Sequence, residues 1–185
     1  MTKPRVLTDC DMVIADWVGS ALVIIDSLTG RRFKLEDCKT FVIEDALLDS
    51  EEDKRIFRRA VARSGFCSML RPLPGAIEGV RALREVAEVH CVTAPNTDCE
   101  TWESERRRWL MQHFDFTKRE IHQTHNKAVV TGQIFIDDKP EHVEQWCKAN
   151  VGIGLLWPQP YNRGTGLVDC EGWDHVADLA RRYWA

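Results

Sequence analysis

Two aspartates, Asp9 and Asp11, stand two residues apart at the end of the short apolar run 5–9. Residues i and i+2 of a strand point to the same face. We therefore expect both carboxylates at the carboxyl edge of a strand, where open α/β sheets bind their ligands. Two carboxylates this close repel each other, which favours a divalent cation or a raised pKa on one of them. Taken alone, the pair has an alternative interpretation as two solvent-facing acids at a strand end.

A second acidic pair, Asp137 and Asp138, follows the apolar stretch 133–136. Because parallel strands align their carboxyl ends, Asp137 is expected to lie near Asp9. Three carboxylates completed by waters are typical of a Mg²⁺ site. Asp138 has an alternative role, since it could instead cap the helix that Pro140 opens.

A hydroxyl and an ammonium group complete the set. Thr93 closes the apolar run 89–93, and Lys127 precedes Asp137 by ten residues, within reach from a neighbouring loop. A lone Thr or Lys is normally a surface residue. The sequential order of Asp-x-Asp, Thr, Lys and Asp-Asp at strand ends is much more specific than any one of these groups.

Alternating strands and helices have to position these side chains. The pattern predicts strands at 5–9, 89–93, 134–136 and 152–157, and helices at 16–27, 51–64, 76–87, 102–113, 140–149 and 174–183. Such alternation favours an α/β fold with a parallel sheet. Residues 17–70 interrupt it and are expected to form a helical insertion after the first strand. Residues 33–49 give no clear prediction.

The composition of the 185 residues is that of an ordinary soluble protein, with 44% hydrophobic and 29% charged residues. The net charge of −4 argues against a nucleic-acid polymer as partner. The one compact basic run, 106–108, lies beside Glu103 and Glu105, which favours a solvated helix face. No apolar run approaches the ~20 residues that span a membrane. Seven cysteines without a CxxC pair indicate free thiols in a reducing compartment, so we expect a cytoplasmic protein.

The arrangement resembles the haloacid dehalogenase (HAD) superfamily and, within it, the 5'(3')-deoxyribonucleotidase family. The matching stretches follow one another along nearly the whole chain, at 6–17, 35–37, 70–76, 91–95, 105–109, 126–130, 134–140 and 159–162. The resemblance implies a Rossmann-like three-layer α/β core with a parallel sheet, formed by residues 1–16 and 71–185. Residues 17–70 then correspond to a small helical cap inserted after the first strand.

The resemblance also implies a Mg²⁺-dependent phosphatase that acts on deoxyribonucleoside monophosphates. Asp9 would be the nucleophile that forms an aspartyl phosphate, and Asp11 the general acid and then the general base. Mg²⁺ would be held by Asp9, by the backbone carbonyl of Asp11 and by Asp137, with Asp138 as a close partner.

The remaining roles concern the substrate. The resemblance implies phosphate contacts from Thr93, Ala94, Lys127, Arg106 and the backbone of Met12, and nucleobase contacts from Trp17 and Phe41. Met12 stands where the family usually has Gly. Trp17 has an alternative role, which is to pack the cap against the core.

Two other functions remain open at this point. The same chemistry could serve another small phosphomonoester, or the chain could be a non-catalytic nucleotide-binding protein that keeps the fold. Retention of Asp11 argues against the binder, because a binder needs no general acid. We expect a small nucleotide as the partner, with no membrane partner, and a homodimer remains open as the assembly.

Overall fold

A five-stranded parallel sheet forms the centre of the protein in the computed structural model, which describes residues 2–184. The strand order is β3-β2-β1-β4-β5, with bounds β1 Arg5–Thr8, β2 Glu88–Thr93, β3 Ile121–Gln123, β4 Ile134–Asp137 and β5 Ile153–Leu156. The predicted α/β class with a parallel sheet is confirmed. Because β1 lies between β2 and β4, the residues that follow it occupy the middle of the carboxyl edge, where the chain order reverses.

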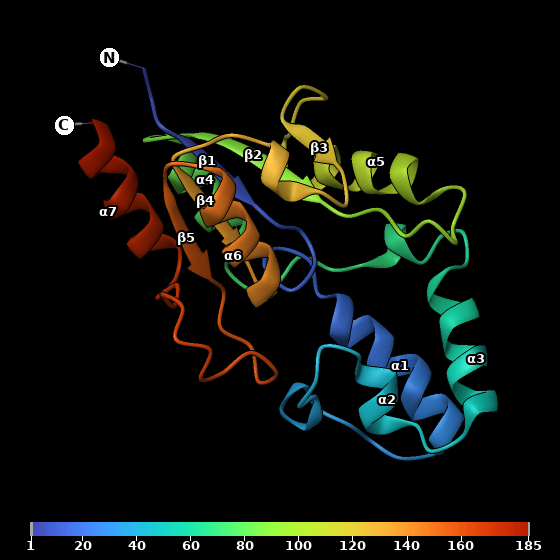
Figure 1. Ribbon diagram of the computed structural model, residues 1–185. Helices are drawn as coiled ribbons and strands as arrows, with labels where there is room; N and C mark the ends of the chain where they lie inside the picture. Colours follow the sequence, from blue (N-terminus) through green and yellow to red (C-terminus); the bar gives the residue numbers. More distant parts are fainter. Residues whose placement is uncertain (1, 185) are drawn as a thin grey trace.

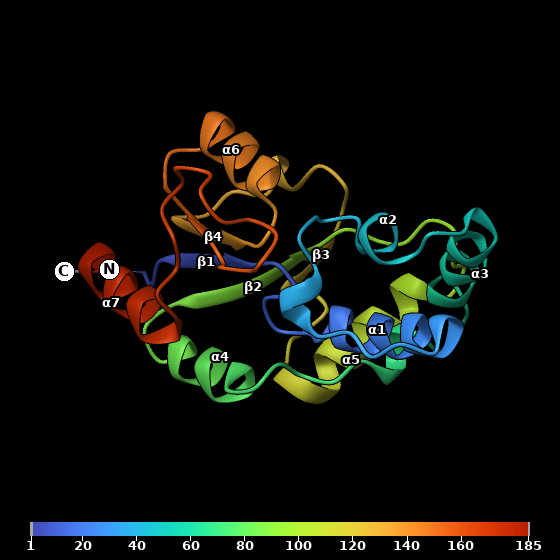
Figure 2. The ribbon, with the colours of Figure 1, turned by 90° about the horizontal axis from the view of Figure 1, so that it is seen from below.

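Helices cover both faces of the sheet and give the molecule three layers (Figure 2). The helix α6, Pro140–Ala149, packs over β4 and β5. The opposite face carries α4, Ala76–Arg84, and α5, Trp102–Phe114, and the closing helix α7, Trp173–Trp184, packs on α4. Coverage on both faces explains why β1 and β4 are almost entirely buried and why apolar residues occupy their middle positions.

A group of helices inserted after β1 lies beyond the carboxyl edge of the sheet (Figure 1). Its elements are α1 Trp17–Thr29, the short 3₁₀ turn η1 Leu35–Asp37, α2 Ile43–Leu47, α3 Glu51–Val61 and the 3₁₀ turn η2 Cys67–Met69. We call residues 17–70 the cap; its exact boundaries stay a prediction. The helix α1 begins where the Asp16 carboxylate accepts a hydrogen bond from the Gly19 N–H at 2.8 Å, and it ends at Gly30, whose φ of 66° suits a glycine.

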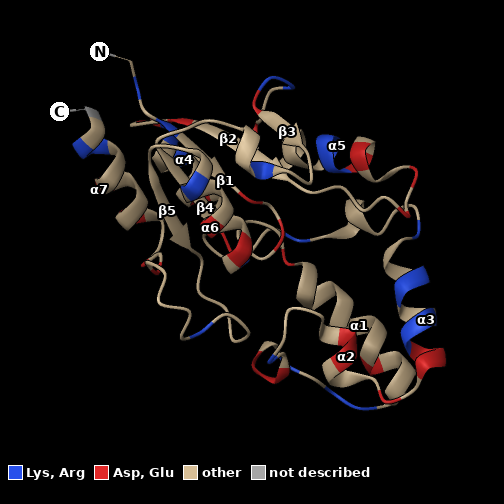
Figure 3. Ribbon diagram, viewed as in Figure 1, with Lys and Arg blue, Asp and Glu red and all other residues tan. Residues whose placement is uncertain are grey.

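Charged side chains on the cap pair with one another across α2 and α3. Arg58 contacts Glu44 at 3.1 Å, and Lys54 contacts Asp45 at 3.2 Å and Glu51 at 2.9 Å. In Figure 3 the Lys and Arg positions of α3 accordingly lie among Asp and Glu positions of the same two helices. This interleaving is unlike the one-sided basic surface of a nucleic-acid binder.

The two chain segments that join cap and core run side by side. Ala15 pairs with Pro72 in an antiparallel bridge, flanked by the hydrogen bonds Asp16 N to Arg71 O at 2.8 Å and Leu73 N to Ile14 O at 2.9 Å. The two segments that connect the cap to the core are thus hydrogen-bonded to each other.

Three features differ from the sequence predictions or were absent from them. The edge strand β3 and the short helix α2 were not predicted. The interpretation of the 106–108 run as a solvated helix face was wrong for Arg106, which is fully buried together with Glu105, while Arg107 and Arg108 are exposed.

All seven cysteines are free thiols. Among the described residues, no helix has the length and apolar character needed to cross a bilayer.

Candidate active site

Three buried carboxylates meet at the carboxyl edge of the sheet. Asp9 follows β1, Asp137 ends β4 and Asp138 comes next in the chain; one oxygen of each lies within 4.8 Å of the others. The backbone places Asp9 there, because its N–H donates to the Ile136 carbonyl at 2.8 Å and so extends the sheet by one residue. Clustered carboxylate oxygens are the ligands that hard divalent cations such as Mg²⁺ prefer, so the donor set fits such an ion.

Lys127 neutralises part of this acidic cluster. Its ammonium Nζ lies 2.7 Å from Asp9 Oδ1 and 2.7 Å from Asp137 Oδ2, and its side chain is only 3% exposed. Asp137 is held further by the Lys139 N–H at 2.9 Å and by His142 Nδ1 at 3.1 Å. The predicted meeting of Asp9, Lys127 and Asp137 is therefore present in the structure.

The cluster shifts the proton affinity of its members in different directions. Burial, with repulsion from Asp137, raises the pKa of Asp9 to about 7 although Lys127 opposes the shift. Burial and repulsion from the other two acids also raise the pKa of Asp138. Burial acts in the same sense on Asp137, but attraction from Lys127 and His142 outweighs it and lowers the pKa. The pKa values of two of the three carboxyls are thus raised, while that of the third is lowered, as expected for acids that share one buried site.

Asp11 and Arg106 form an ion pair in which Arg106 is fully buried, while Asp11 is half-buried and lines the cavity described below. Arg106 Nη2 lies 2.7 and 2.8 Å from the two oxygens of Asp11, Nη1 lies 2.6 Å from Cys10 Sγ, and the guanidinium stacks on Trp102 at 5.0 Å. We predicted that Arg106 contacts phosphate, but its side chain is 0% exposed and does not line the cavity. Arg106 instead fixes the direction of the Asp11 carboxylate, whose oxygens are not among the clustered acids.

The backbone between Asp11 and Ala15 curls into a tight loop. Met12 has a φ of 59°, a left-handed conformation that glycine, the residue expected at this position from the family resemblance, adopts more easily. The Met12 N–H donates to the Ala15 carbonyl at 2.8 Å. Its carbonyl accepts from Gln159 Nε2 at 2.8 Å, and its sulfur accepts from the Val18 N–H at 3.3 Å. These contacts show how a residue with a side chain is accommodated here. They also engage both backbone groups of Met12, so its N–H does not point to a phosphate site as predicted.

Thr93 stands at the end of β2, where phosphate contacts were predicted. Its hydroxyl is buried and finds no hydrogen-bond partner among the described residues. A buried hydroxyl without a partner is costly, so a ligand oxygen in this position would satisfy it. Ala94, the next residue, lines the cavity.

A cavity of about 320 Å³ opens between this edge of the core and the cap. Trp17 and Phe41 line it from the cap, as predicted, and Met12 lines it from the core. Trp17 also packs edge-on against Phe57 at 6.4 Å and Phe66 at 6.2 Å, so it contacts the cap interior as well as the cavity. The packing role of Trp17 therefore has contacts that support it, and the nucleobase contact stays a prediction.

The sequence analysis missed three side chains of this site. Tyr161 and His142 line the cavity, and Gln159 holds Met12. The stretch 159–162 already matched the family resemblance, and its polar and aromatic residues after a buried strand were the available signal. No sequence spacing connects that loop with residues near position 12, so its role depends on the fold.

Comparisons with known proteins agree with this geometry. The model of the family "5' nucleotidase, deoxy (Pyrimidine), cytosolic type C protein" matches residues 3–183. The human cytosolic 5'(3')-deoxyribonucleotidase is 32% identical over 201 aligned positions, covering 96% of this chain and 94% of the relative. The mouse mitochondrial 5'(3')-deoxyribonucleotidase is 30% identical over 152 positions, covering 74% of this chain and 65% of the relative.

Solved structures resemble the fold at low sequence identity. A haloacid dehalogenase-like hydrolase from Streptococcus pneumoniae aligns with a TM-score of 0.57 at 13% identity over 99% of both chains. The HAD-type protein YfnB of Bacillus subtilis, solved with bound magnesium, aligns with a TM-score of 0.56 at 12% identity over 97% of this chain and 99% of that chain.

The parallel sheet, with an acidic cluster at the middle of its carboxyl edge and a helical insertion facing it, has the fold of the HAD-like hydrolases. The family model and the human relative make the chain a phosphomonoester hydrolase of this fold. This model and this relative match nearly the full length of the chain, which identifies the family within this class. The chain belongs to the 5'(3')-deoxyribonucleotidase family.

Proposed function

We propose that the protein is a Mg²⁺-dependent nucleotidase that hydrolyses deoxyribonucleoside monophosphates to nucleoside and phosphate. The observation that carries this proposal is the position of Asp9. Its carboxylate lies beside the Lys127 ammonium at 2.7 Å, within the acidic cluster, and at the base of a cavity that the cap closes with aromatic side chains. Asp9, Lys127 and the aromatic side chains of the cap therefore face one space.

In this mechanism an oxygen of Asp9 attacks phosphorus, and the bond from phosphorus to the nucleoside oxygen breaks. Asp11 gives a proton to that leaving oxygen, and the phosphoryl group remains on Asp9 as an acyl phosphate. Asp11 then takes a proton from water, which attacks phosphorus and releases phosphate and free Asp9. In the structure Arg106 contacts both oxygens of Asp11, so one oxygen has to leave Arg106 and take up a proton before Asp11 acts as the acid, while the other contact keeps the carboxyl in place.

Phosphate binding is assigned to groups at the same edge. Lys127 and the unpartnered hydroxyl of Thr93 contact the phosphoryl oxygens, together with the backbone at Ala94. Asp9, Asp137 and Asp138 fit a divalent cation with their side chains, and the Asp11 carbonyl is the further predicted ligand. When bound, Mg²⁺ supplies positive charge that offsets the developing negative charge on the phosphoryl group.

The substrate is assigned from the family and the cavity together. Both relatives described above are named for deoxyribonucleotides, and YfnB was solved with magnesium. The aromatic rings of Trp17 and Phe41 can stack on a nucleobase while the phosphate sits at the acidic cluster.

A phosphate-release screen tests the proposal. The purified protein is assayed with deoxyribonucleoside monophosphates and with sugar phosphates, in Mg²⁺ and in chelator, beside the Asp9→Asn variant. Release from deoxynucleotides that requires both Mg²⁺ and Asp9 is the expected result. Faster release from sugar phosphates would indicate a different phosphomonoester, and binding without release would indicate a nucleotide-binding protein.

A further inference from the structure

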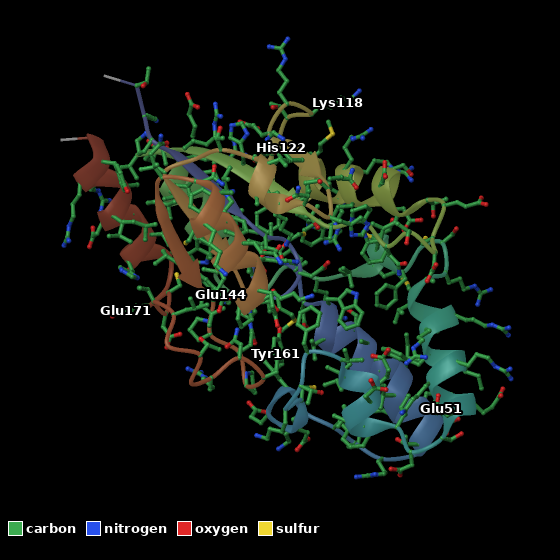
Figure 4. All side chains as sticks on the ribbon, in the orientation of Figure 1. Glu51, Lys118, His122, Glu144, Tyr161 and Glu171 are labelled. Atoms are coloured by element: carbon green, nitrogen blue, oxygen red, sulfur yellow. The ribbon has the colours of Figure 1, made fainter. Side chains whose placement is uncertain are left out.

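The loop after β5 reaches back across the sheet edge and contacts both the core and the cap. Figure 4 places Tyr161 of this loop in the region where the core meets the cap. Tyr161 also lines the cavity beside Asp138 and Phe41. Tyr161 was not among the predicted catalytic, metal-binding or substrate-binding residues, and the reaction steps described above do not use it.

The first contact of Tyr161 is with the acidic cluster. Its hydroxyl donates a hydrogen bond to Asp138 Oδ2. The next residue, Asn162, donates from Nδ2 to the backbone carbonyl of the same Asp138 at 2.7 Å and to the Trp157 carbonyl at 2.9 Å. Two consecutive loop residues thus hold the side chain and the backbone of one carboxylate residue. This carboxylate is pushed away by Asp137 and Asp9, so a donor that steadies it matters.

The second contact of Tyr161 is with the cap. Its ring meets the ring of Phe41 edge to face, with centroids 5.9 Å apart. The ammonium of Lys139, which follows Asp138 in the chain, lies 4.6 Å from the centroid of the same Phe41 ring. Phe41 therefore rests between two core side chains that flank Asp138, although half of its own surface is exposed. Such edge-to-face and cation–π contacts are directional, so they define where the cap rests.

We propose that Tyr161 is a positioning residue that couples the cap to the acidic cluster. Its hydroxyl fixes the Asp138 carboxylate, and its ring seats Phe41, so cap position and divalent-cation affinity change together. The inference rests on the proposed metal-dependent function and goes beyond it, because it assigns a role to a residue outside the reacting groups. It predicts that a change in the cap alters metal binding even without substrate.

The test measures Mg²⁺ binding by calorimetry, without substrate, on four proteins: wild type, Tyr161→Phe, Phe41→Ala and the double variant. Tyr161→Phe keeps the ring and removes only the hydroxyl. A hydrogen bond to a charged group corresponds to about a tenfold change in affinity or more, so we expect Mg²⁺ to bind Tyr161→Phe about tenfold more weakly. Phe41→Ala should weaken Mg²⁺ binding by a smaller factor, at most about tenfold, and only while the Tyr161 hydroxyl is present.

Controls separate this inference from the proposed function. Tyr183 is the only other tyrosine and lies exposed on α7, so Tyr183→Phe should bind Mg²⁺ as wild type does. Thermal unfolding checks that each variant is folded. If Tyr161→Phe binds Mg²⁺ as tightly as wild type, or Phe41→Ala has the same effect in both backgrounds, the coupling is refuted while the nucleotidase proposal stands. If the wild type neither binds Mg²⁺ nor releases phosphate, the nucleotidase proposal fails, and the coupling fails with it.

Discussion

Replacing Lys127 by Met tests the charge arrangement of the site most directly. The ammonium lies 2.7 Å from oxygens of both Asp9 and Asp137, and the side chain is 3% exposed. Methionine keeps an unbranched chain of similar length but carries no charge. Breaking a buried ion pair by removing one partner costs about 3–5 kcal/mol, because the other charge is left uncompensated. Lys127→Met should therefore lower the free energy of unfolding by about this amount in chelator.

Mg²⁺ should restore part of the free energy of unfolding that Lys127→Met loses. A divalent cation among Asp9, Asp137 and Asp138 supplies positive charge where the ammonium is missing, and a ligand that binds only the native state stabilises it. Lys127 also repels a cation bound beside it, so its removal increases the stabilisation that Mg²⁺ gives. We expect Mg²⁺ to raise the free energy of unfolding more in Lys127→Met than in wild type.

Urea unfolding, in chelator and in saturating Mg²⁺, measures both effects. The matched control is Lys148→Met, since Lys148 is 78% exposed and lies 3.9 Å from Glu144, and such surface changes stay within about 0.5 kcal/mol. A loss below about 1 kcal/mol in chelator, or the same Mg²⁺ effect in Lys127→Met as in wild type, would refute Lys127 as the charge partner of the cluster. Phosphate release should be lost in Lys127→Met under both conditions.

Three further predictions follow from the same geometry. Asp9→Asn should abolish phosphate release while far-ultraviolet circular dichroism shows the fold intact, and substantial release by the folded variant would remove Asp9 as nucleophile. Because the pKa of Asp9 is raised to about 7 from 3.8, the metal-free native state holds a proton that the unfolded chain has lost, so its stability should fall as pH rises from about 4 to 7. Over the same pH range the affinity for Mg²⁺ should rise, and Mg²⁺ binding should release protons. Calorimetry in buffers of different ionisation enthalpy counts the protons released. Mg²⁺ binding that releases no proton at pH 6 would contradict this prediction. Trp17→Ala should lower kcat/KM on deoxynucleotides by roughly 5- to 150-fold, as expected for a lost stacking contact, and leave a small aryl phosphate nearly unaffected. Trp17→Phe is its control, and equal losses on both substrates would mean that Trp17 only packs against Phe57 and Phe66.

The sequence predicted most of the sheet and the acidic cluster for one physical reason. Strands buried on both faces appear as continuous apolar runs, and the polar residue that ends each run is then placed at the carboxyl edge. Asp9 and Asp137 were found in this way, and parallel pairing of β1 with β4 brings them together. The three-residue strand β3 was missed because its sequence, Ile-His-Gln, carries one apolar residue and gives no such run.

Arg106 could not be placed from the sequence because its environment comes from distant residues. Neighbouring charges at 103, 105, 107 and 108 favour an exposed helix face, but Arg106 pairs with Asp11, which is 95 positions away. Glu105 is likewise buried by a tertiary contact, since its carboxylate accepts from the Gly65 N–H at the end of the cap at 2.8 Å. Burial of a charged residue depends on a partner that only the fold supplies.

The charges at the carboxyl edge predict that proton, metal and phosphate binding are linked at this site. Four carboxylates lie in or behind the cavity with two cationic side chains: Asp9, Asp11, Asp137 and Asp138 with Lys127 and Arg106. Unpaired buried charge is costly, and the raised pKa values of Asp9 and Asp138 are the response of the metal-free protein. A divalent cation carries the two missing positive charges and removes the reason for holding those protons. Without it, a phosphate dianion meets either a protonated Asp9, which cannot attack, or a net negative site, so under the proposed mechanism we expect cation binding to precede or accompany substrate binding.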